Sequence, residues 1–290
     1  MANLKELRIK IGGIRAIRKV TAAMKLVAGV KLRKAEQRAL TSKPYANELK
    51  KILARIKREN LAKTYELFDG RESVKNEILI AFASDKGFCG NFNYLLSKKL
   101  KDIIEKRRTA GINVKILCIG NKLYQMLKHS VFENATLELA DDDFYKGEIL
   151  GNARSLASRV IDEFRKETVD KVSLVYTHYY SAMRMVVDEE SLIPLNREEN
   201  NDITETIFEP SADEVLENLL PYNLGVQIYQ AALESMASEQ SSRMRSMDNA
   251  TRNADEMLGD LTVRYNRTRQ YGITQELTEV VAGASAVAND

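Results

Sequence analysis

Apolar and small residues recur every three or four positions along the last quarter of the chain. From about Pro221 to Val287 this spacing is that of one face of a helix, and the stripe comprises Val226, Tyr229, Leu233, Met236, Gln240, Met244, Met247, Thr251, Ala254, Leu258, Leu261, Tyr265 and Thr268. Such a helix would be about 100 Å long at ~1.5 Å per residue, too long for a compact body to enclose. The pattern therefore predicts a coiled coil that projects from the body.

A second helical stripe begins at the N-terminus and predicts a helix over residues 2–58. Its apolar positions are Leu4, Leu7, Ile11, Ile14, Ile17, Val20, Met24 and Val27. Pro44 lacks a backbone donor and clashes with the preceding turn, so it is expected to kink or restart this helix. The simplest topology folds this helix, in a segment spanning 1–58, antiparallel against the C-terminal helix, in a segment spanning 211–288.

The pattern changes between the two long helices. Short apolar runs predict buried strands at 77–83, 114–119 and 171–178, with a fourth beginning at 183–187. Helical patterns at 91–108, 122–128 and 148–166 lie between these strands. Alternating strands and helices indicate a largely parallel sheet, so residues 75–200 are expected to form an α/β, Rossmann-like lobe. The predicted fold is thus an α/β lobe plus a long antiparallel coiled coil of N- and C-terminal helices.

Charge is unevenly distributed along a chain whose net charge is only +3. The first forty residues carry eleven basic side chains and two acidic ones. A solvated face, an acidic protein partner and a polyanion all fit such a helix. No aromatic residue stands among the basic ones before Tyr45, so a base-stacking platform is missing. A protein partner is favoured, with no nucleic acid.

Candidate chemistry is sparse. The turn ASDKGFCGNFN at 83–93 could hold a phosphate on backbone amides, but it has neither GxGxxG spacing nor GK[ST]. Gly87 and Gly90 are more simply explained as allowing a tight turn to pack on the sheet. Three consecutive acids at 141–143 could hold a cation, yet they point in different directions and are typical of a solvated loop. No cofactor or metal is expected.

Catalytic constellations are equally scarce. His129 and His178 are the only histidines, and no HExxH or paired CxxC is present. Cys89 and Cys118 give no disulfide framework and indicate thiols in a reducing compartment. The charged start MANLKELRIK is not that of a signal peptide, and no run approaches the length of a membrane span. We therefore expect a soluble, intracellular protein with no catalytic residue.

Several segments resemble the gamma subunit of rotary F-type ATP synthases. TRQYGITQELTEVVAGASAV at 268–287 is similar to that family's signature, and RAIRKVTAAMKLVAGVKLRKAE at 15–36 is similar to its N-terminal helix. SDKGFCGNFN, FEPSADEVLENLLP and LESMASEQSSRMRSMDNATRNA resemble further family segments in the same order. The resemblance covers essentially the whole chain.

This resemblance implies the central rotor shaft of the ATP synthase, one copy per complex. The terminal helices would turn inside a ring of alpha and beta subunits, and the lobe would sit with the epsilon subunit on the c-ring. Ion-driven rotation of the c-ring would then drive conformational change and ATP synthesis or hydrolysis in that ring. Association with the membrane would come only through the c-ring, at the cytoplasmic face of a bacterial cell membrane rather than an organelle membrane.

The resemblance also assigns residues. Arg269 and Gln270 match positions that hydrogen-bond a loop on beta, and Thr274 and Glu276 match further beta contacts. Met24 and Arg243 match positions near the beta lever that affect coupling, and Glu209 matches a glutamate at the foot near the c-ring. Departures from the family pattern at 29–30 and 271–272 affect the fine contacts rather than the role.

Two other functions fit parts of the pattern. A coiled-coil interaction scaffold unrelated to ATP synthase would explain the periodicities but not the ITQEL tip. A nucleotide-binding α/β enzyme would use the turn from Asp85 to Gly90, and saturable ATP binding by the isolated protein would favour it.

Overall fold

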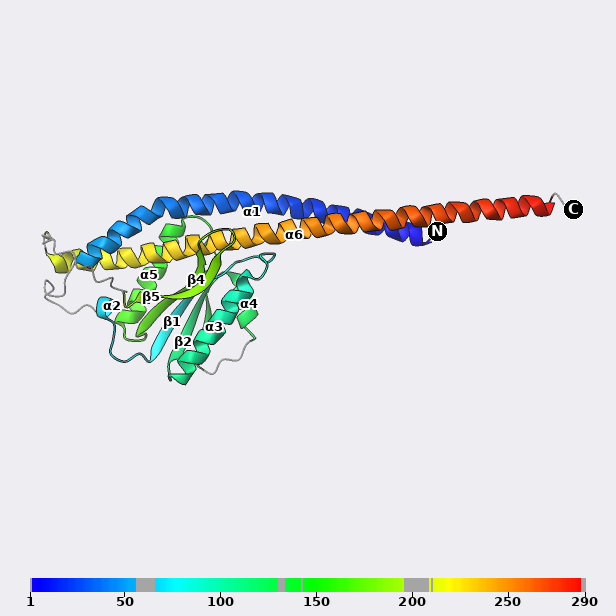
Figure 1. Cartoon of the computed structure of the whole chain (residues 1–290). Coiled ribbons are helices and arrows are strands. Elements are labelled where there is room, and N and C mark those ends of the chain that lie inside the picture. The colour runs from blue at the N-terminus through cyan, green and yellow to red at the C-terminus, as the bar shows by residue number, and fades with distance from the viewer. Residues whose placement is uncertain are drawn as a thin grey trace. The chain divides into compact units, whose positions relative to one another are not determined.

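The computed structural model describes residues 2–55, 66–129, 134–141, 143–195, 209 and 211–287. They form two compact units, one of Met1–Ala28 with Arg243–Asp290 and one of Gly29–Ser242. Helix α1 (Ala2–Arg55) and helix α6 (Ala212–Val287) each contribute to both units (Figure 1). The two units are divided inside α1 and α6, between residues 28 and 29 and between residues 242 and 243. The predicted segments 1–58, 75–200 and 211–288 instead keep each long helix whole. That three-part division therefore stays a prediction.

The second unit contains a five-stranded sheet in the order β3-β2-β1-β4-β5. Strands β1 to β4 run parallel to one another, whereas the edge strand β5 pairs antiparallel with β4. This confirms the predicted α/β lobe with a largely parallel sheet. The strands are β1 (Asn76–Phe82), β2 (Asn113–Ile119), β3 (Ala135–Asp141), β4 (Lys171–Tyr179) and β5 (Met185–Ile193).

Alternation along β1 creates two cores, one on each face of the sheet. Ile78, Ile80 and Phe82 face a cluster built with α5 (Ile149–Arg165) and the first part of α6. Leu79 and Ala81 face a second cluster, built with α3 (Phe92–Thr109) and α4 (Asn121–Leu127). Because successive side chains of a strand point to opposite faces, one continuous apolar run serves both cores. The short helix α2 (Glu66–Asp69) adds Leu67 and Phe68 to the first core.

Strand β3 was not predicted, because it is an edge strand whose Leu137 and Leu139 are only partly buried and leave a weak apolar signal. At Pro44 a kink or a restart of the helix was expected. The helix α1 runs through Pro44 without a restart, and the kink stays a prediction. In α6, likewise, Pro221 lies inside the helix, which begins nine residues earlier at Ala212.

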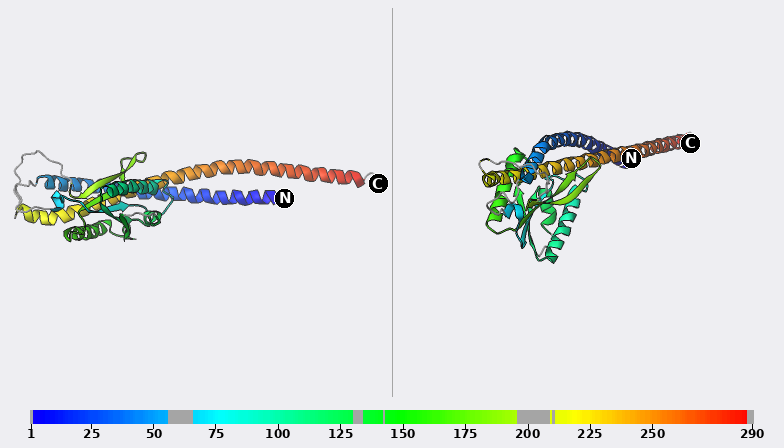
Figure 2. Two further views of the ribbon diagram at one scale, coloured as in Figure 1. Left: turned by 90° about the horizontal axis from the view of Figure 1, so that it is seen from below. Right: turned by 60° about the vertical axis from the view of Figure 1, so that its left-hand side comes forward.

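In the first unit, α1 and α6 run side by side in opposite directions (Figure 2). Arg18 forms an ion pair with Asp255, and the Lys25 ammonium lies 2.6 Å from an oxygen of Asp248. Residue numbers therefore rise on α1 as they fall on α6, which confirms the predicted antiparallel pair. The helix α6 then continues to Val287, well beyond the N-terminal end of α1.

The predicted contact stripe is correct on α6 but only partly correct on α1. In α6, the predicted positions from Met244 to Thr268 are all buried or partly buried. In α1, Ile17, Val20 and Val27 are 53%, 57% and 56% exposed. The contact passes instead through Arg18, Thr21, Lys25 and Ala28. A step of four residues from Ile14 leads to Arg18 and keeps the heptad spacing, whereas the predicted step of three leads to Ile17. Hydrophobicity alone could not reveal this, because polar side chains make the contact.

Candidate functional site

The glycine-containing turn at the carboxyl end of β1 is held by hydrogen bonds between its own residues. Asn93 Nδ2 donates to Ser84 Oγ at 2.7 Å and contacts Cys89 Sγ at 3.2 Å, and the Ser84 backbone N–H donates to Asn93 Oδ1 at 3.2 Å. Gly90 has a φ of 60°, where glycine is favoured. The polar groups of this turn are thus engaged with one another, which agrees with a tight turn packed on the sheet.

The helix α6 lies across the ends of the parallel strands, where open α/β sheets bind their ligands. Ser235 Oγ donates to the Phe82 carbonyl of β1 at 3.0 Å, and Ser238 Oγ donates to the Thr177 carbonyl of β4 at 3.1 Å. The sheet order reverses between these two strands. Both serines are buried, so the helix fills the place that a nucleotide would take. This argues against the nucleotide-binding alternative.

A shallow hollow lies at the opposite, amino-terminal ends of β1 and β2. Its volume is about 410 Å³, and its lining includes Lys115 and Glu163, whose charged groups pair at 2.9 Å. The described residues contain no group of three or more side chains suited to hold a metal ion. Of the three consecutive acids, Asp141 ends β3, Asp143 pairs with Lys146, and Asp142 lies outside the described residues.

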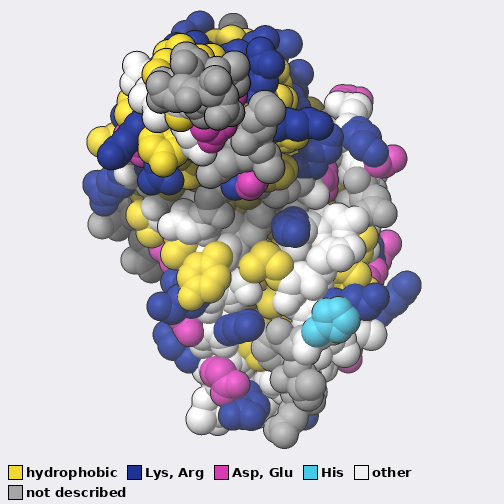
Figure 3. All heavy atoms as spheres, turned by 90° about the vertical axis from the view of Figure 1, so that its right-hand side faces the viewer, with side chains coloured by type: hydrophobic (Ala, Val, Ile, Leu, Met, Phe, Trp, Pro, Cys, Tyr) yellow, Lys and Arg dark blue, Asp and Glu magenta, His cyan; other side chains and the backbone are white. Residues whose placement is uncertain are grey.

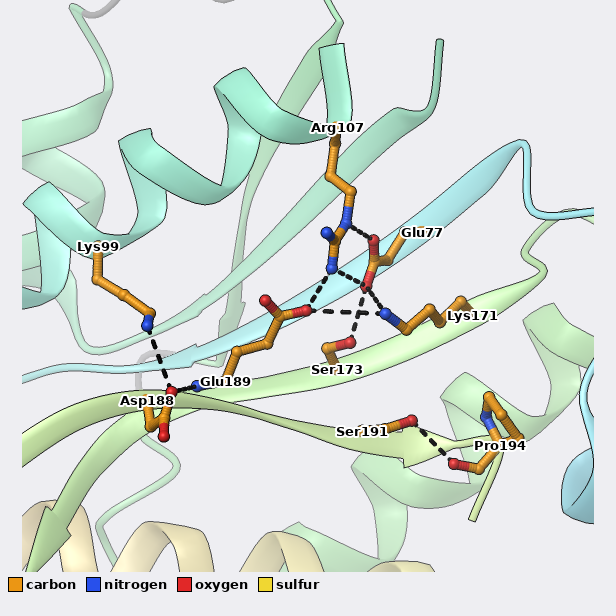
Figure 4. Close-up of polar contacts among 9 residues, drawn as sticks. All are labelled: Glu77, Lys99, Arg107, Lys171, Ser173, Asp188, Glu189, Ser191 and Pro194. Atoms are coloured by element: carbon orange, nitrogen blue, oxygen red, sulfur yellow. Dashed lines mark hydrogen bonds and ion pairs between the residues drawn. The ribbon is translucent and has the colours of Figure 1, made fainter. Parts of the chain in front are cut away.

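The most buried charge of the lobe belongs to Glu77, at the start of β1. Its carboxylate accepts hydrogen bonds from Arg107 of α3 and from Ser173 Oγ, the latter at 2.7 Å, and Lys171 Nζ lies 3.1 Å away (Figure 4). Desolvation acts to raise the pKa of Glu77, but these donors outweigh it and hold the pKa below its usual value. Glu189 shares Arg107 and Lys171, so the network ties α3, β1, β4 and β5 together.

His178 is held by contacts within the protein. His178 Nδ1 lies 3.2 Å from Glu234 Oε2 of α6, and its ring centroid is 4.3 Å from that of Tyr176. The hydrogen bond to Glu234 raises the pKa of His178, with further contributions from the charges of Glu190 and Asp188. No hydroxyl or thiol nucleophile is hydrogen-bonded to His178 in the described structure.

Two of the predicted partner-binding residues lie within the paired part of the first unit. Met24, on α1, is partly buried, and Arg243, on α6, is 9% exposed. The neighbouring Lys25 pairs with Asp248, five residues from Arg243 along α6. The view along the helix pair shows lysine and arginine side chains gathered around it, with hydrophobic side chains between them (Figure 3).

The other four residues predicted to contact beta lie on the part of α6 that extends beyond α1. Arg269, Gln270, Thr274 and Glu276 are all exposed. Thr274 Oγ1 donates to the Gln270 carbonyl at 2.9 Å, so its lone pairs remain available to accept a hydrogen bond. Helical spacing places polar and apolar residues on the same stripes, because Arg269, Ile273, Glu276 and Val280 follow steps of four, three and four.

Glu209, the residue predicted at the foot, is exposed. No helix in the described parts of the chain is long and apolar enough to cross a membrane.

Comparison with known proteins adds the family. A family model described as ATP synthase matches residues 3–287. The ATP synthase gamma chain of Pelagibacter ubique is 38% identical over 295 residues, covering 99% of this chain and 100% of that protein. The chain belongs to the ATP synthase gamma chain family. The gamma chain of Fusobacterium nucleatum, 36% identical, likewise matches over 99% of this chain and 100% of its own length.

Solved structures agree in fold. A chain of the Euglena gracilis mitochondrial ATP synthase, in an assembly of OSCP, F1 and c-ring, is similar with a TM-score of 0.67 at 15% identity, over 99% of this chain and 95% of that one. A rotor chain of the same complex gives a TM-score of 0.63 at 15% identity, over 94% and 99%. The gamma-family resemblance read from the sequence is therefore confirmed, and neither alternative function is supported.

Sequence reasoning missed the polar contacts between α6 and the strand ends. The serines at 235, 238, 241 and 242 were visible as a cluster of small polar residues inside the predicted helix. Without the sheet, nothing indicated that their hydroxyls would meet strand carbonyls.

Proposed function

We propose that this chain is the central rotor shaft of an F-type ATP synthase and has no catalytic residue of its own. The α/β lobe would rest with the epsilon subunit on the c-ring, and the helix pair would turn inside the ring of alpha and beta subunits. Membership of the gamma chain family supports this function. The relatives named above are bacterial, which supports a place at the cytoplasmic face of the cell membrane.

The observation that carries the proposal is the extension of α6 beyond α1. From 269 to 284 every residue except Gly272 is exposed, including Ile273, Leu277, Val280 and Val281 at 50%, 61%, 69% and 63%. An apolar surface of this kind marks a place where another molecule binds. A sleeve of alpha and beta subunits would cover it, while Arg269, Gln270, Thr274 and Glu276 hydrogen-bond to beta.

A matched pair of arginine variants tests the tip. In a purified, reconstituted complex, Arg269→Ala should lower ATP hydrolysis and ion pumping, because a charged donor to beta is lost. Arg267→Ala removes the same charge from another face of the exposed helix and should change neither rate. Equal effects of the two substitutions would contradict the assignment of Arg269.

Met24 and Arg243 are proposed to lie near the beta lever and to affect coupling. Met24→Lys places a cation at a partly buried position, where it must find an acidic partner or lose hydration. We expect fewer ions pumped per ATP hydrolysed, whereas Met126→Lys on the lobe, where the side chain is 37% exposed, should leave this ratio unchanged. An unchanged ratio in Met24→Lys would remove that residue from the coupling contacts.

Glu209 is proposed to contact the c-ring at the foot of the shaft. Glu209→Lys should weaken the association of the alpha–beta–gamma complex with c-ring membranes, measured by salt extraction, with Glu217→Lys of α6, also exposed, as the control. The three segments 1–58, 75–200 and 211–288 are proposed as its working parts, two helices and a lobe. The isolated chain should not hydrolyse ATP.

A further inference from the structure

Helix α6 is held on the sheet of the second unit by two kinds of contact. The first is apolar, made by side chains such as Leu220, Leu224 and Ile228 that enter the core with α5 and the sheet. Apolar burial is non-directional, so it holds the helix against the sheet but sets its axial position less sharply than a hydrogen bond does.

The second kind of contact is polar and lies at the carboxyl ends of two neighbouring strands. Ser235 donates to the carbonyl of Phe82, the last residue of β1, and Ser238 donates to the carbonyl of Thr177 in β4. The two serines are 1% and 0% exposed. They stand three residues apart, so they share one face of α6 and reach both strand ends at once.

An ion pair lies directly beside these hydrogen bonds. Glu234, the residue before Ser235, faces His178, the residue after Thr177, at 3.2 Å. Tyr179 follows on β4, and its hydroxyl donates to Glu36 of α1 at 2.6 Å. The end of β4 is therefore tied to both long helices. Together, Ser235, Ser238, Glu234 and His178 form the strand-end joint.

We propose that the strand-end joint fixes the register of α6 on the lobe and passes torque from the lobe to the shaft. The inference rests on the proposed rotor function. In a rotor driven at the lobe, the load acts to twist or slide α6 against the sheet. Hydrogen bonds to two strand carbonyls resist such displacement because they weaken steeply with distance and angle. The four side chains are positioning residues, and the two serines that carry the hydrogen bonds are buried.

The test uses the complete ATP synthase reconstituted in vesicles. The double variant S235A/S238A removes both hydroxyls with little change in volume. ATP hydrolysis should stay at the wild-type rate, and ions pumped per ATP should fall severalfold as the opposing ion gradient increases. Reduced assembly would lower hydrolysis and pumping together and would show no dependence on load.

Ser191→Ala is the matched control. Its Oγ donates to the Pro194 carbonyl at 2.8 Å, a serine-to-backbone bond within the lobe in which α6 takes no part. The control should pump as the wild type does at every load. A double variant with wild-type pumping under load, or a control that loses as much as the double variant, would overturn the proposal.

Two further arms keep the result interpretable. If S235A/S238A does not assemble, Ser238→Ala alone should give a smaller loss with the same dependence on load, and a load-independent result would count against the joint. If the wild-type complex itself pumps no ions while hydrolysing ATP, the proposed rotor function fails, and the strand-end joint fails with it. If the wild-type complex pumps normally, a difference between it and the variant tests the strand-end joint alone.

Discussion

The helix α6 meets two very different surroundings along its length. From 223 to 242, in the second unit, no residue is exposed, and the stretch is rich in alanine and serine. From 269 to 284, in the first unit, only Gly272 is not exposed. The small side chains of 223–242 let the helix backbone approach the sheet closely. The stretch 269–284 has no such neighbour, because it lies beyond the end of α1. One helix thus serves as part of a core at one end and as a free surface at the other.

The free end is not stabilised by its own unit. Helices in proteins owe most of their stability to the packing of one apolar face. Beyond Thr268, that face carries Ile273, Leu277, Val280 and Val281 into solvent. Truncation of a buried side chain in the second unit should therefore lower the stability of the isolated chain, whereas truncation of an exposed side chain at the tip should leave that stability almost unchanged.

The largest contrast is expected between two apolar truncations. Phe82 is fully buried between α6 and the sheet. Phe82→Ala should lower the free energy of unfolding by about 3–5 kcal/mol, the usual cost of removing a buried aromatic ring. Leu277→Ala at the exposed tip should change it by less than about 0.5 kcal/mol. Urea denaturation of the isolated chain measures both, and similar losses would contradict the comparison.

Glu77→Ala should have an effect of similar size within the second unit. It leaves Arg107 and Lys171 with Glu189 as their remaining carboxylate, so the cost should lie at the lower end of the range for a broken buried pair, about 3 kcal/mol. Lys99→Ala breaks the exposed pair with Asp188 and should cost less than about 1 kcal/mol. Because the pKa of Glu77 is lowered on folding, its contribution is present above the unfolded value of 4.5 and is lost as the pH falls through the folded value. The variant should show a weaker loss of stability with acid.

A smaller effect is expected where α1 and α6 pair. Thr251 Oγ1 donates to Thr21 Oγ1 at 2.8 Å, and Thr21 Oγ1 lies 3.1 Å from the Arg18 carbonyl. Thr21→Val and Thr251→Val should each cost about 1 kcal/mol, and the double variant should cost less than their sum because the two hydroxyls satisfy each other. Strict additivity in a double-mutant cycle would show that the hydroxyls do not interact.

The smallest effect concerns pH. The hydrogen bond to Glu234 raises the pKa of His178 on folding. Its contribution to stability is therefore complete below the unfolded value of 6.5 and is lost as the pH rises through the folded value. NMR titration should place the His178 pKa above that of the unfolded chain, and Glu234→Gln should bring it down. A His178 pKa that Glu234→Gln leaves in place would remove this ion pair from the account.

Hydrophobic periodicity was sufficient to predict both long helices, the antiparallel pairing and the parallel sheet. It failed where polar residues make the contact. After Ile14 the apolar pattern leads to Ile17, but the contact between α1 and α6 is made by Arg18 and Thr21. These side chains are polar, so a hydrophobic pattern does not predict them. Strand β3 was missed for a different reason, since it is an edge strand whose two leucines are separated by Glu138 and do not form a continuous apolar run.

The residues proposed to have a function show the same limit. The tip residues Arg269 and Gln270 could be assigned only through the family resemblance, because an exposed side chain on a long helix has no local signal of its own. The strand-end joint could not be found from the sequence at all. A serine hydroxyl and a strand carbonyl become partners only when α6 is laid over β1 and β4, and the two contacts join residues 153 and 61 positions apart.

The proposed rotation of this chain inside the ring of alpha and beta subunits can be observed directly. Lys101→Cys gives an exposed thiol on the lobe, while the native Cys89 and Cys118 are buried, so a bead can be attached at one place. In a surface-fixed complex with alpha and beta subunits, ATP should drive rotation of the bead in one direction, with one step for each beta subunit. A complex that hydrolyses ATP at its full rate while the bead stands still would contradict the account.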